Sequence, residues 1–296
     1  MAPVRTCLLT ANSDKMRQTD KIPLNDGSGI PQLGFGCFQV TNAEIETVMR
    51  WAVEAGYRYF DAATRYENEA GVGNGLRGSG VPREELYVVG KMWPSSFDDP
   101  VRAIEYSLRQ LNLEYIDSYY LHWPSSSEAR RFKAWEAMLK YREKGLVRSV
   151  GVSNFTRPQL EGLIRAYGVT PVVNQIELHP WYPQTDLCGW CRQAGMAVTA
   201  WGPIFRGCID EVPLLTELGE RYGKTPAQVT LRWHLQHGNV VIPKSSSRDR
   251  ILSNTKLYDF ELSAEDMAQI DALECGRHFG DDPNTNDGGN FHPEGL

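Results

Sequence analysis

The sequence lacks long hydrophobic runs and any excess of positive charge. No stretch approaches the roughly 18 consecutive apolar residues of a transmembrane helix, so we expect no membrane association. The net charge is −6 and the pI is near 5.6, which argues against a protein that binds nucleic acid. A small anion could still be held by a local basic pocket. The composition, 41% hydrophobic and 23% charged, is that of an ordinary globular protein.

Cysteine is also scarce, with six residues in 296, and only Cys188 and Cys191 lie close together, in DLCGWC. A C-x-x-C pair near a helix start can serve redox exchange or metal binding, but no second pair or histidine pair completes a zinc site. We interpret both residues as structural thiols and expect no bound metal. The only apolar core in residues 1–20 is CLLTA, too short for a secretory signal, and Asp14 argues against a transit peptide. We expect a loosely ordered extension there and a cytoplasmic protein.

What the sequence does contain is a repeated alternation of strand-like and helix-like segments. Helical patterns such as 42–56, 100–114, 134–145 and 158–168 separate the strand-like runs. Eight such units predict a (β/α)8 barrel over residues 21–275. A hairpin around Asn25-Asp26-Gly27 is expected at the start of this range, before the first unit, and an irregular tail over the pocket rim is expected at 276–296. The strand-like runs are LGFG near 33, YRYF at 57, LYVVGK at 86, DSYYLH at 117, VRSVGV at 147, VVNQI at 172, AVTAW at 197 and NVVIP at 239.

A doubly wound sheet is the alternative fold, but it normally carries a phosphate-binding loop after its first strand. A literal G-x-G-x-x-G occurs at Gly73, Gly75 and Gly78. It lies inside a helical pattern with no strand directly before it, so we do not interpret it as a cofactor loop.

Reactive side chains follow the predicted strands where a barrel carries its active site. Asp61 ends the second strand and Tyr66 lies in the loop beyond, while Lys91 and His122 end the third and fourth strands. A lysine at the end of the apolar run LYVV needs a carboxylate partner, which Asp61 can supply. The cation is expected to lower the pKa of Tyr66 from about 10 toward neutrality, making it a general acid. His122 would orient a carbonyl oxygen.

The motifs GYRYFDAATRYENE, VVGKMW, YYLHWP, VRSVGVSNF, VVNQIELHP and IPKSSSRDRILSN occur in the order seen in the aldo-keto reductases, which residues 20–275 resemble. The short loops resemble the compact branch that includes prostaglandin F synthase and 2,5-diketogluconate reductase. The resemblance implies reduction of aldehydes or ketones with NADPH. It also implies a catalytic tetrad in which Tyr66 is the proton donor, Lys91 and Asp61 tune it, and His122 orients the carbonyl.

The resemblance further implies how a cofactor would be held. Ser153, Asn154 and Gln175 match the positions that hold the carboxamide, and Trp201 matches the aromatic residue that stacks on the nicotinamide. Lys244, Ser245 and Arg250 match the positions that hold the adenosine 2′-phosphate. Asn254 matches the position near the adenine. Two cations and hydroxyls beside a helix N-terminus are suited to a phosphate, which favours NADPH over NADH.

The chain departs from the family pattern at four positions: Ala62 replaces a common threonine, Gly202 a hydroxyl residue, Ser253 a frequent acidic residue and Phe38 a common tryptophan. Phe38, Trp93 and Trp123 are expected to form an aromatic substrate pocket, and Phe205 is considered as a further member.

We expect a monomeric enzyme acting on a small carbonyl compound. A non-catalytic NADPH-binding protein on the same barrel is the main alternative, and a metal-dependent barrel hydrolase is a weaker one.

Overall fold

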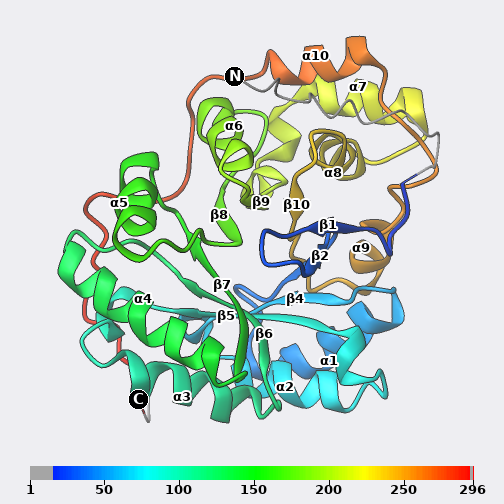
Figure 1. Ribbon diagram of the computed structural model, residues 1–296. Helices are drawn as coiled ribbons and strands as arrows, with labels where there is room; N and C mark the ends of the chain where they lie inside the picture. The colour runs from blue at the N-terminus through cyan, green and yellow to red at the C-terminus, as the bar shows by residue number, and fades with distance from the viewer. Residues whose placement is uncertain (1–15, 294–295) are drawn as a thin grey trace.

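The computed structural model describes residues 16–293 and 296, and its centre is an eight-stranded parallel sheet closed into a barrel (Figure 1). Neighbouring strands follow one another in the chain, so the sheet runs from β3 to β10 without a crossover. The barrel prediction is confirmed, and the doubly wound alternative is wrong. The strands are β3 Phe35–Gly36, β4 Tyr59–Asp61, β5 Tyr87–Met92, β6 Ile116–Leu121, β7 Val147–Ser153, β8 Val173–Glu177, β9 Ala197–Trp201 and β10 Val240–Val241.

The barrel closes between its first and last strands. Leu33 forms a parallel bridge with Val241, and Gly34 N donates to Val241 O over 2.8 Å. Gly36 N donates to Pro243 O over 3.1 Å. A Cβ atom on Gly36 would lie 2.8 Å from Ile242 O, so glycine permits the close approach that completes the barrel.

Helices surround the sheet on its outer side (Figure 1). The helix α4 begins at Glu128, six residues before the predicted pattern at 134–145, because Ser127 caps it by accepting from Arg130 N. Its first turns are polar and carry little hydrophobic periodicity. The helices are α1 Asn42–Glu54, α2 Glu69–Arg77, α3 Pro100–Leu111, α4 Glu128–Glu143, α5 Arg157–Tyr167, α6 Thr185–Gln193, α7 Pro213–Tyr222, α8 Pro226–Gln236, α9 Arg248–Ser253 and α10 Ala264–Asp271.

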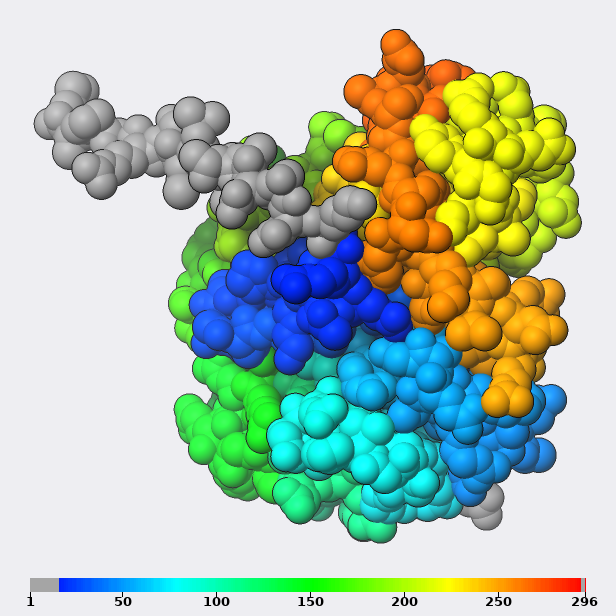
Figure 2. Space-filling view, turned by 90° about the vertical axis from the view of Figure 1, so that its right-hand side faces the viewer, coloured from blue at the N-terminus to red at the C-terminus, as the bar shows by residue number. Residues whose placement is uncertain are grey.

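The N-terminal hairpin covers one end of the barrel. Its strands β1 (Lys21–Pro23) and β2 (Gly29–Pro31) pair antiparallel, as predicted, with Gly27 at a φ of +86° in the turn. Leu24 and Ile30 belong to the same buried cluster as the barrel residues Tyr59, Tyr87 and Tyr120. Figure 2 shows the hairpin in dark blue across one face of the molecule. The barrel is therefore plugged at this end, which leaves the opposite end for chemistry.

The glycines of the G-x-G-x-x-G match lie in or at the end of α2, as the sequence indicated. A Cβ atom on Gly73 would lie 1.9 Å from Leu111 O, and one on Gly75 would lie 2.6 Å from the Cβ of Met49. These glycines let α2 pack closely against α1 and α3, which explains their spacing without a cofactor.

Residues 272–293 form no helix or strand, so the predicted irregular tail is confirmed over this range. Most of the predicted loose extension, residues 1–15, lies outside the described residues. The division of the chain at residues 20 and 275 stays a prediction. Within the described residues no helix combines the length and the apolar character needed to cross a bilayer.

Candidate active site

Three of the four predicted tetrad residues meet at the buried ammonium group of Lys91. Lys91 lies in β5 and Asp61 ends the neighbouring β4, while Tyr66 ends the short 3-10 helix Thr64–Tyr66. Lys91 Nζ donates to Asp61 Oδ1, to Ala62 O over 2.9 Å and to the Tyr66 hydroxyl over 3.1 Å. The lysine is 0% exposed, and these three hydrogen bonds give each of its ammonium protons a protein acceptor. This arrangement offsets the cost of burying the charge.

The charges of this group act on Tyr66 in opposite directions. Burial alone would lower the pKa of Lys91, but the attraction of Asp61 and Tyr66 raises it, so the lysine stays positive. Burial raises the pKa of Tyr66 to about 12, and the nearby Lys91 cation offsets only part of that rise. The expectation that Lys91 lowers this pKa toward neutrality is therefore wrong: desolvation of the phenolate outweighs the attraction. Tyr66 is a fully protonated donor at neutral pH.

His122 follows β6 and packs against two aromatic rings. Its ring lies 5.5 Å from the Tyr66 ring and 4.9 Å from the Trp93 ring, both edge to face. Burial, with the positive charges of Lys91 and Arg65, holds the pKa of His122 well below its usual value. The imidazole is therefore neutral and carries one N–H donor. Its Nδ1 is buried and has no hydrogen-bond partner among the described residues.

Asp61 has two further partners that the sequence interpretation did not include. The Tyr59 hydroxyl donates to Asp61 Oδ2 over 3.2 Å, and Gln175 Nε2 donates to the same oxygen over 2.7 Å. Tyr59 lies two residues before Asp61 on β4, on the same face of the strand, so the strand period was a usable signal. Nothing in the linear sequence indicates that Gln175, on β8, reaches Asp61.

The residues predicted to hold a carboxamide form one polar group beside the tetrad. Asn154 has a φ of +64° and its Nδ2 donates to His122 O over 3.0 Å and to Ser153 Oγ over 3.1 Å. The Ser153 hydroxyl donates to Gln175 O over 2.8 Å. Trp201 Nε1 donates to Asn154 Oδ1 over 2.7 Å. Ser153, Asn154, Gln175 and Trp201 thus lie together, as predicted, and connect to the tetrad through Gln175.

A second group of predicted residues surrounds the start of α9. The Arg250 Nε donates to the buried Ser245 Oγ over 3.3 Å, and the same oxygen accepts from Ser247 N over 3.1 Å. Burial and the nearby Arg250 charge lower the pKa of Lys244 against the opposing attraction of Glu44. Neither Lys244 nor Arg250 has an ion-pair partner in the part of the chain that the structure describes. Asn254 is buried at the end of this helix.

The predicted aromatic pocket is brought together only in part. The Phe38 ring is 40% exposed and lies 5.1 Å from the Tyr66 ring, and Trp93 borders His122. Trp123 directly follows His122 in the sequence and is buried. Within residues 16–293 no ring contact joins Trp123 to the tetrad. Phe205 is wrongly placed by the sequence interpretation. Its φ is +60° and its ring is fully buried, 4.7 Å from the Trp181 ring.

Comparison with known proteins identifies the family to which this barrel belongs. A family model described as "Aldo/keto reductase family" matches residues 28–274. The chain belongs to the aldo/keto reductase family. It is 43% identical over 267 residues to an aldo-keto reductase of Mycolicibacterium smegmatis, covering 90% of this chain and 97% of the relative. It is 41% identical over 264 residues to the methylglyoxal reductase DkgA of Escherichia coli, covering 88% and 96%.

The solved structures agree. A crystal structure of an aldo/keto reductase from Brucella melitensis superimposes with a TM-score of 0.83 at 42% identity, covering 86% of this chain and 99% of that one. As an aldo-keto reductase the protein is an oxidoreductase that reduces carbonyl groups of small molecules. Members of the family generally use a nicotinamide cofactor, typically NADPH. No observation favours the non-catalytic alternative.

Three of the residues that depart from the aldo-keto reductase pattern have defined local contacts or backbone geometry. Ala62 contributes its carbonyl oxygen to Lys91, a contact that needs no particular side chain. Gly202 has a φ of +62°, which residues with side chains rarely adopt. The Ser253 hydroxyl donates to Arg250 O over 3.2 Å, inside α9.

The C-terminal tail of this aldo-keto reductase forms hydrogen bonds with the segment that carries Trp93. Trp93 Nε1 donates to Gly288 O over 2.7 Å, and the Ser95 hydroxyl donates to Phe291 O. Asp287 accepts from the hydroxyls of Ser125 and Ser126, each over 2.6 Å. These contacts place residues 287–291 beside Trp93, and the placement of the whole tail over a pocket rim stays a prediction.

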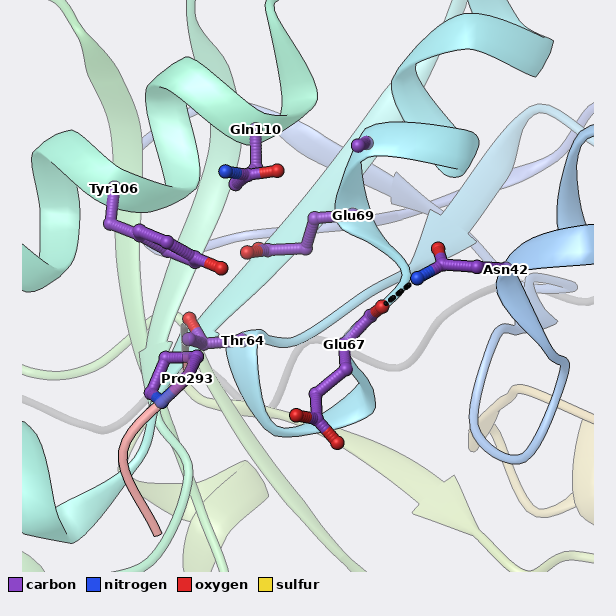
Figure 3. A pocket seen from close by; sticks show the side chains of 8 residues that line it. Asn42, Thr64, Glu67, Glu69, Tyr106, Gln110 and Pro293 are labelled. Atoms are coloured by element: carbon purple, nitrogen blue, oxygen red, sulfur yellow. Dashed lines mark hydrogen bonds between the residues drawn. The ribbon is translucent and has the colours of Figure 1, made fainter. Parts of the chain in front are cut away.

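A separate cavity of about 310 Å³ lies on the outside of the barrel, between α2, α3 and the tail (Figure 3). Glu69 is 3% exposed there and points toward Tyr106 (Figure 3). Its Oε2 accepts from Ser107 Oγ over 3.3 Å, while its Oε1 has no hydrogen-bond partner among the described residues. Burial raises the pKa of Glu69 to about 7, against the opposing effects of Ser107 and Lys91. None of the predicted site residues lines this cavity.

The two closely spaced cysteines lie in α6, and both are free and buried. Burial raises the pKa of Cys188 to about 12 and that of Cys191 to about 11, so both stay thiols at neutral pH. This supports the structural interpretation. Among the described residues no group of three His, Cys, Asp or Glu side chains is placed to hold a metal ion.

Proposed function

We propose that this aldo-keto reductase reduces aldehydes or ketones with NADPH, and that Tyr66 donates the proton. The observation that carries the proposal is the contact of the buried Lys91 with both Asp61 and Tyr66, beside a neutral His122. A phenol held at a fixed point next to a neutral N–H donor is suited to receive a carbonyl oxygen.

The residues present fit a dinucleotide with an extra phosphate. Lys244, Ser245 and Arg250 would hold the 2′-phosphate, since neither cation forms an ion pair in the described region and the buried Ser245 hydroxyl contacts Arg250. Asn254 would lie at the adenine. Ser153, Asn154 and Gln175 would hold the carboxamide, with Trp201 against the ring. When bound, the nicotinamide supplies the hydride, which no side chain can provide.

The chain itself supplies the proton and the orientation. His122 and the Tyr66 hydroxyl bind the carbonyl oxygen, which polarises the carbonyl group. As negative charge develops on that oxygen, the Tyr66 proton moves to it. Lys91 stabilises the phenolate that remains, and Asp61 keeps the lysine charged and in place. The exposed Phe38 and the half-buried Trp93 would form apolar walls around the substrate.

The test is Tyr66→Phe, which removes the proton donor and keeps the ring. A positioned general acid contributes about 10²- to 10⁴-fold, so turnover of a panel of aldehydes should fall by at least about a hundredfold. Binding of NADPH, measured by quenching of tryptophan fluorescence, should stay nearly unchanged. Retention of more than about a tenth of the activity would exclude the role of Tyr66. Tight NADPH binding by the unaltered protein without cofactor oxidation on any substrate would favour the non-catalytic alternative. A monomeric state and a cytoplasmic location stay predictions.

A further inference from the structure

Arg65 lies directly before Tyr66 and is held against the aromatic side of the site. Its guanidinium carbon is 4.5 Å from the centroid of the Phe291 ring and 5.6 Å from that of Trp93. The two rings are themselves 6.4 Å apart and edge to face. Such cation–π contacts restrain the guanidinium without using its N–H donors. Arg65 has no hydrogen bond or ion pair within the described part of the chain.

The charge of Arg65 reaches the reacting end of the site. Trp93 contacts both residues, because its ring lies 5.6 Å from the Arg65 guanidinium carbon and 4.9 Å from the His122 ring. After burial and the Lys91 charge, Arg65 is the third influence that lowers the pKa of His122. Lys91 forms an ion pair with Asp61, whereas Arg65 has no ion-pair partner in the described part of the chain.

Neither Asp287 nor Glu67 forms an ion pair or a hydrogen bond with Arg65 in the described part of the chain. Asp287 on the tail is held by Ser125 and Ser126, whose hydrogen bonds lower its pKa. Glu67, two residues beyond Arg65, is exposed and lines the outer cavity. Arg65 therefore places a cation with unused N–H donors beside the rings of Trp93 and Phe291. Such a guanidinium is suited to a planar oxyanion that can accept two hydrogen bonds at once.

We propose that Arg65 is a specificity-determining residue that favours carbonyl substrates carrying a carboxylate. This inference rests on the proposed function and names the substrate class more closely. The carboxylate binds the guanidinium near Trp93 and Phe291, and the carbonyl oxygen of the same molecule reaches Tyr66 and His122. The carboxylate takes no part in the reduction, so its effect falls on binding and orientation.

The experiment compares 4-carboxybenzaldehyde with its neutral methyl ester, methyl 4-formylbenzoate, each reduced with NADPH. The unaltered enzyme should show the higher kcat/KM for the acid. In Arg65→Met the acid-to-ester ratio of kcat/KM should fall by about ten- to a hundredfold, mainly through KM for the acid. In Arg65→Lys the ratio should fall less, since the charge remains but the bidentate fork is lost. Added salt should lower the acid-to-ester ratio in the unaltered enzyme and in Arg65→Lys, which carry a cation at position 65, but not in Arg65→Met.

Arg50→Met is the matched control, because Arg50 is on α1, pairs with Glu46 and should leave the ratio unchanged. An unchanged ratio in Arg65→Met would overturn the proposal. So would an equal loss on both substrates, since that would show only a structural effect on the neighbouring Tyr66. Failure of the unaltered enzyme to reduce either aldehyde with NADPH would instead count against the proposed function.

Discussion

Gln175 Nε2 donates a hydrogen bond of 2.7 Å to Asp61 Oδ2 across the width of the barrel. The two residues lie on β8 and β4, which are four strands apart in the closed sheet of eight. Gln175 also accepts from Ser153 at its backbone oxygen, next to Asn154 and Trp201. The proposed carboxamide group and the proposed proton-donating group are therefore one hydrogen-bonded network, with Gln175 as the link.

A change at Gln175 should consequently alter the tetrad. In Gln175→Glu, two carboxyl groups face each other at hydrogen-bond distance, so one must hold a proton and its pKa rises. Stability and carbonyl reduction should then be greatest at low pH and fall as the pH rises from about 5 to 8. Gln175→Met is the control, because it loses a hydrogen bond to a carboxylate, about 1.5 to 3 kcal/mol, without adding a charge. Thermal melts and steady-state rates at several pH values check this, and identical pH trends in the two variants would contradict it.

The ionisations in the site predict a flat pH profile for reduction. The pKa of Tyr66 is raised to about 12, so its proton stays on throughout the neutral and mildly alkaline range. The pKa of His122 is well below its usual value, so the imidazole stays neutral over the same range. At saturating cofactor and substrate, kcat should therefore change less than about twofold between about pH 7 and 10. A loss of kcat with an apparent pKa of about 7 to 8 would instead support the lowered tyrosine pKa that the sequence suggested.

Much of this site could be predicted because it lies at strand ends. Asp61, Lys91 and His122 each follow or end a hydrophobic run, so the barrel places them at one end without further information. The Gln175 contact could not be predicted in this way, because it depends on closure of the sheet between residues 114 positions apart. The prediction of a lowered Tyr66 pKa was wrong because the direction of the shift depends on how deeply the phenol is buried, which no sequence pattern specifies. Phe205 was misplaced because its ring packs in the buried core against Trp181, a contact that its place near Gly202 in the sequence does not indicate.

The cations at α9 should determine the choice between NADPH and NADH. Lys244→Met and Arg250→Met each remove one counter-charge for the 2′-phosphate, so KM for NADPH should rise by about ten- to a hundredfold. KM for NADH should change little, since NADH carries no phosphate there. Arg248→Met is the matched control, because Arg248 lies on the same helix and pairs with Glu54 over 3.0 Å. Equal effects of the three variants on NADPH would contradict the assignment.

The buried carboxyl group of Glu69 should make stability depend on pH. Its pKa rises from 4.5 to about 7 on folding, so the folded state favours the protonated form. This contribution, about 3 kcal/mol, is present in full below pH 4.5 and is lost as the pH rises through about 7. Glu69→Gln keeps the neutral form at every pH, so at pH 8 it should be more stable than the unaltered protein and at pH 4.5 should lose that advantage. Glu84→Gln, at an exposed position, is the control. Urea unfolding at both pH values checks the difference, and a pH-independent effect of Glu69→Gln would show that the carboxyl group is not the source, because only an ionising group can make the difference depend on pH.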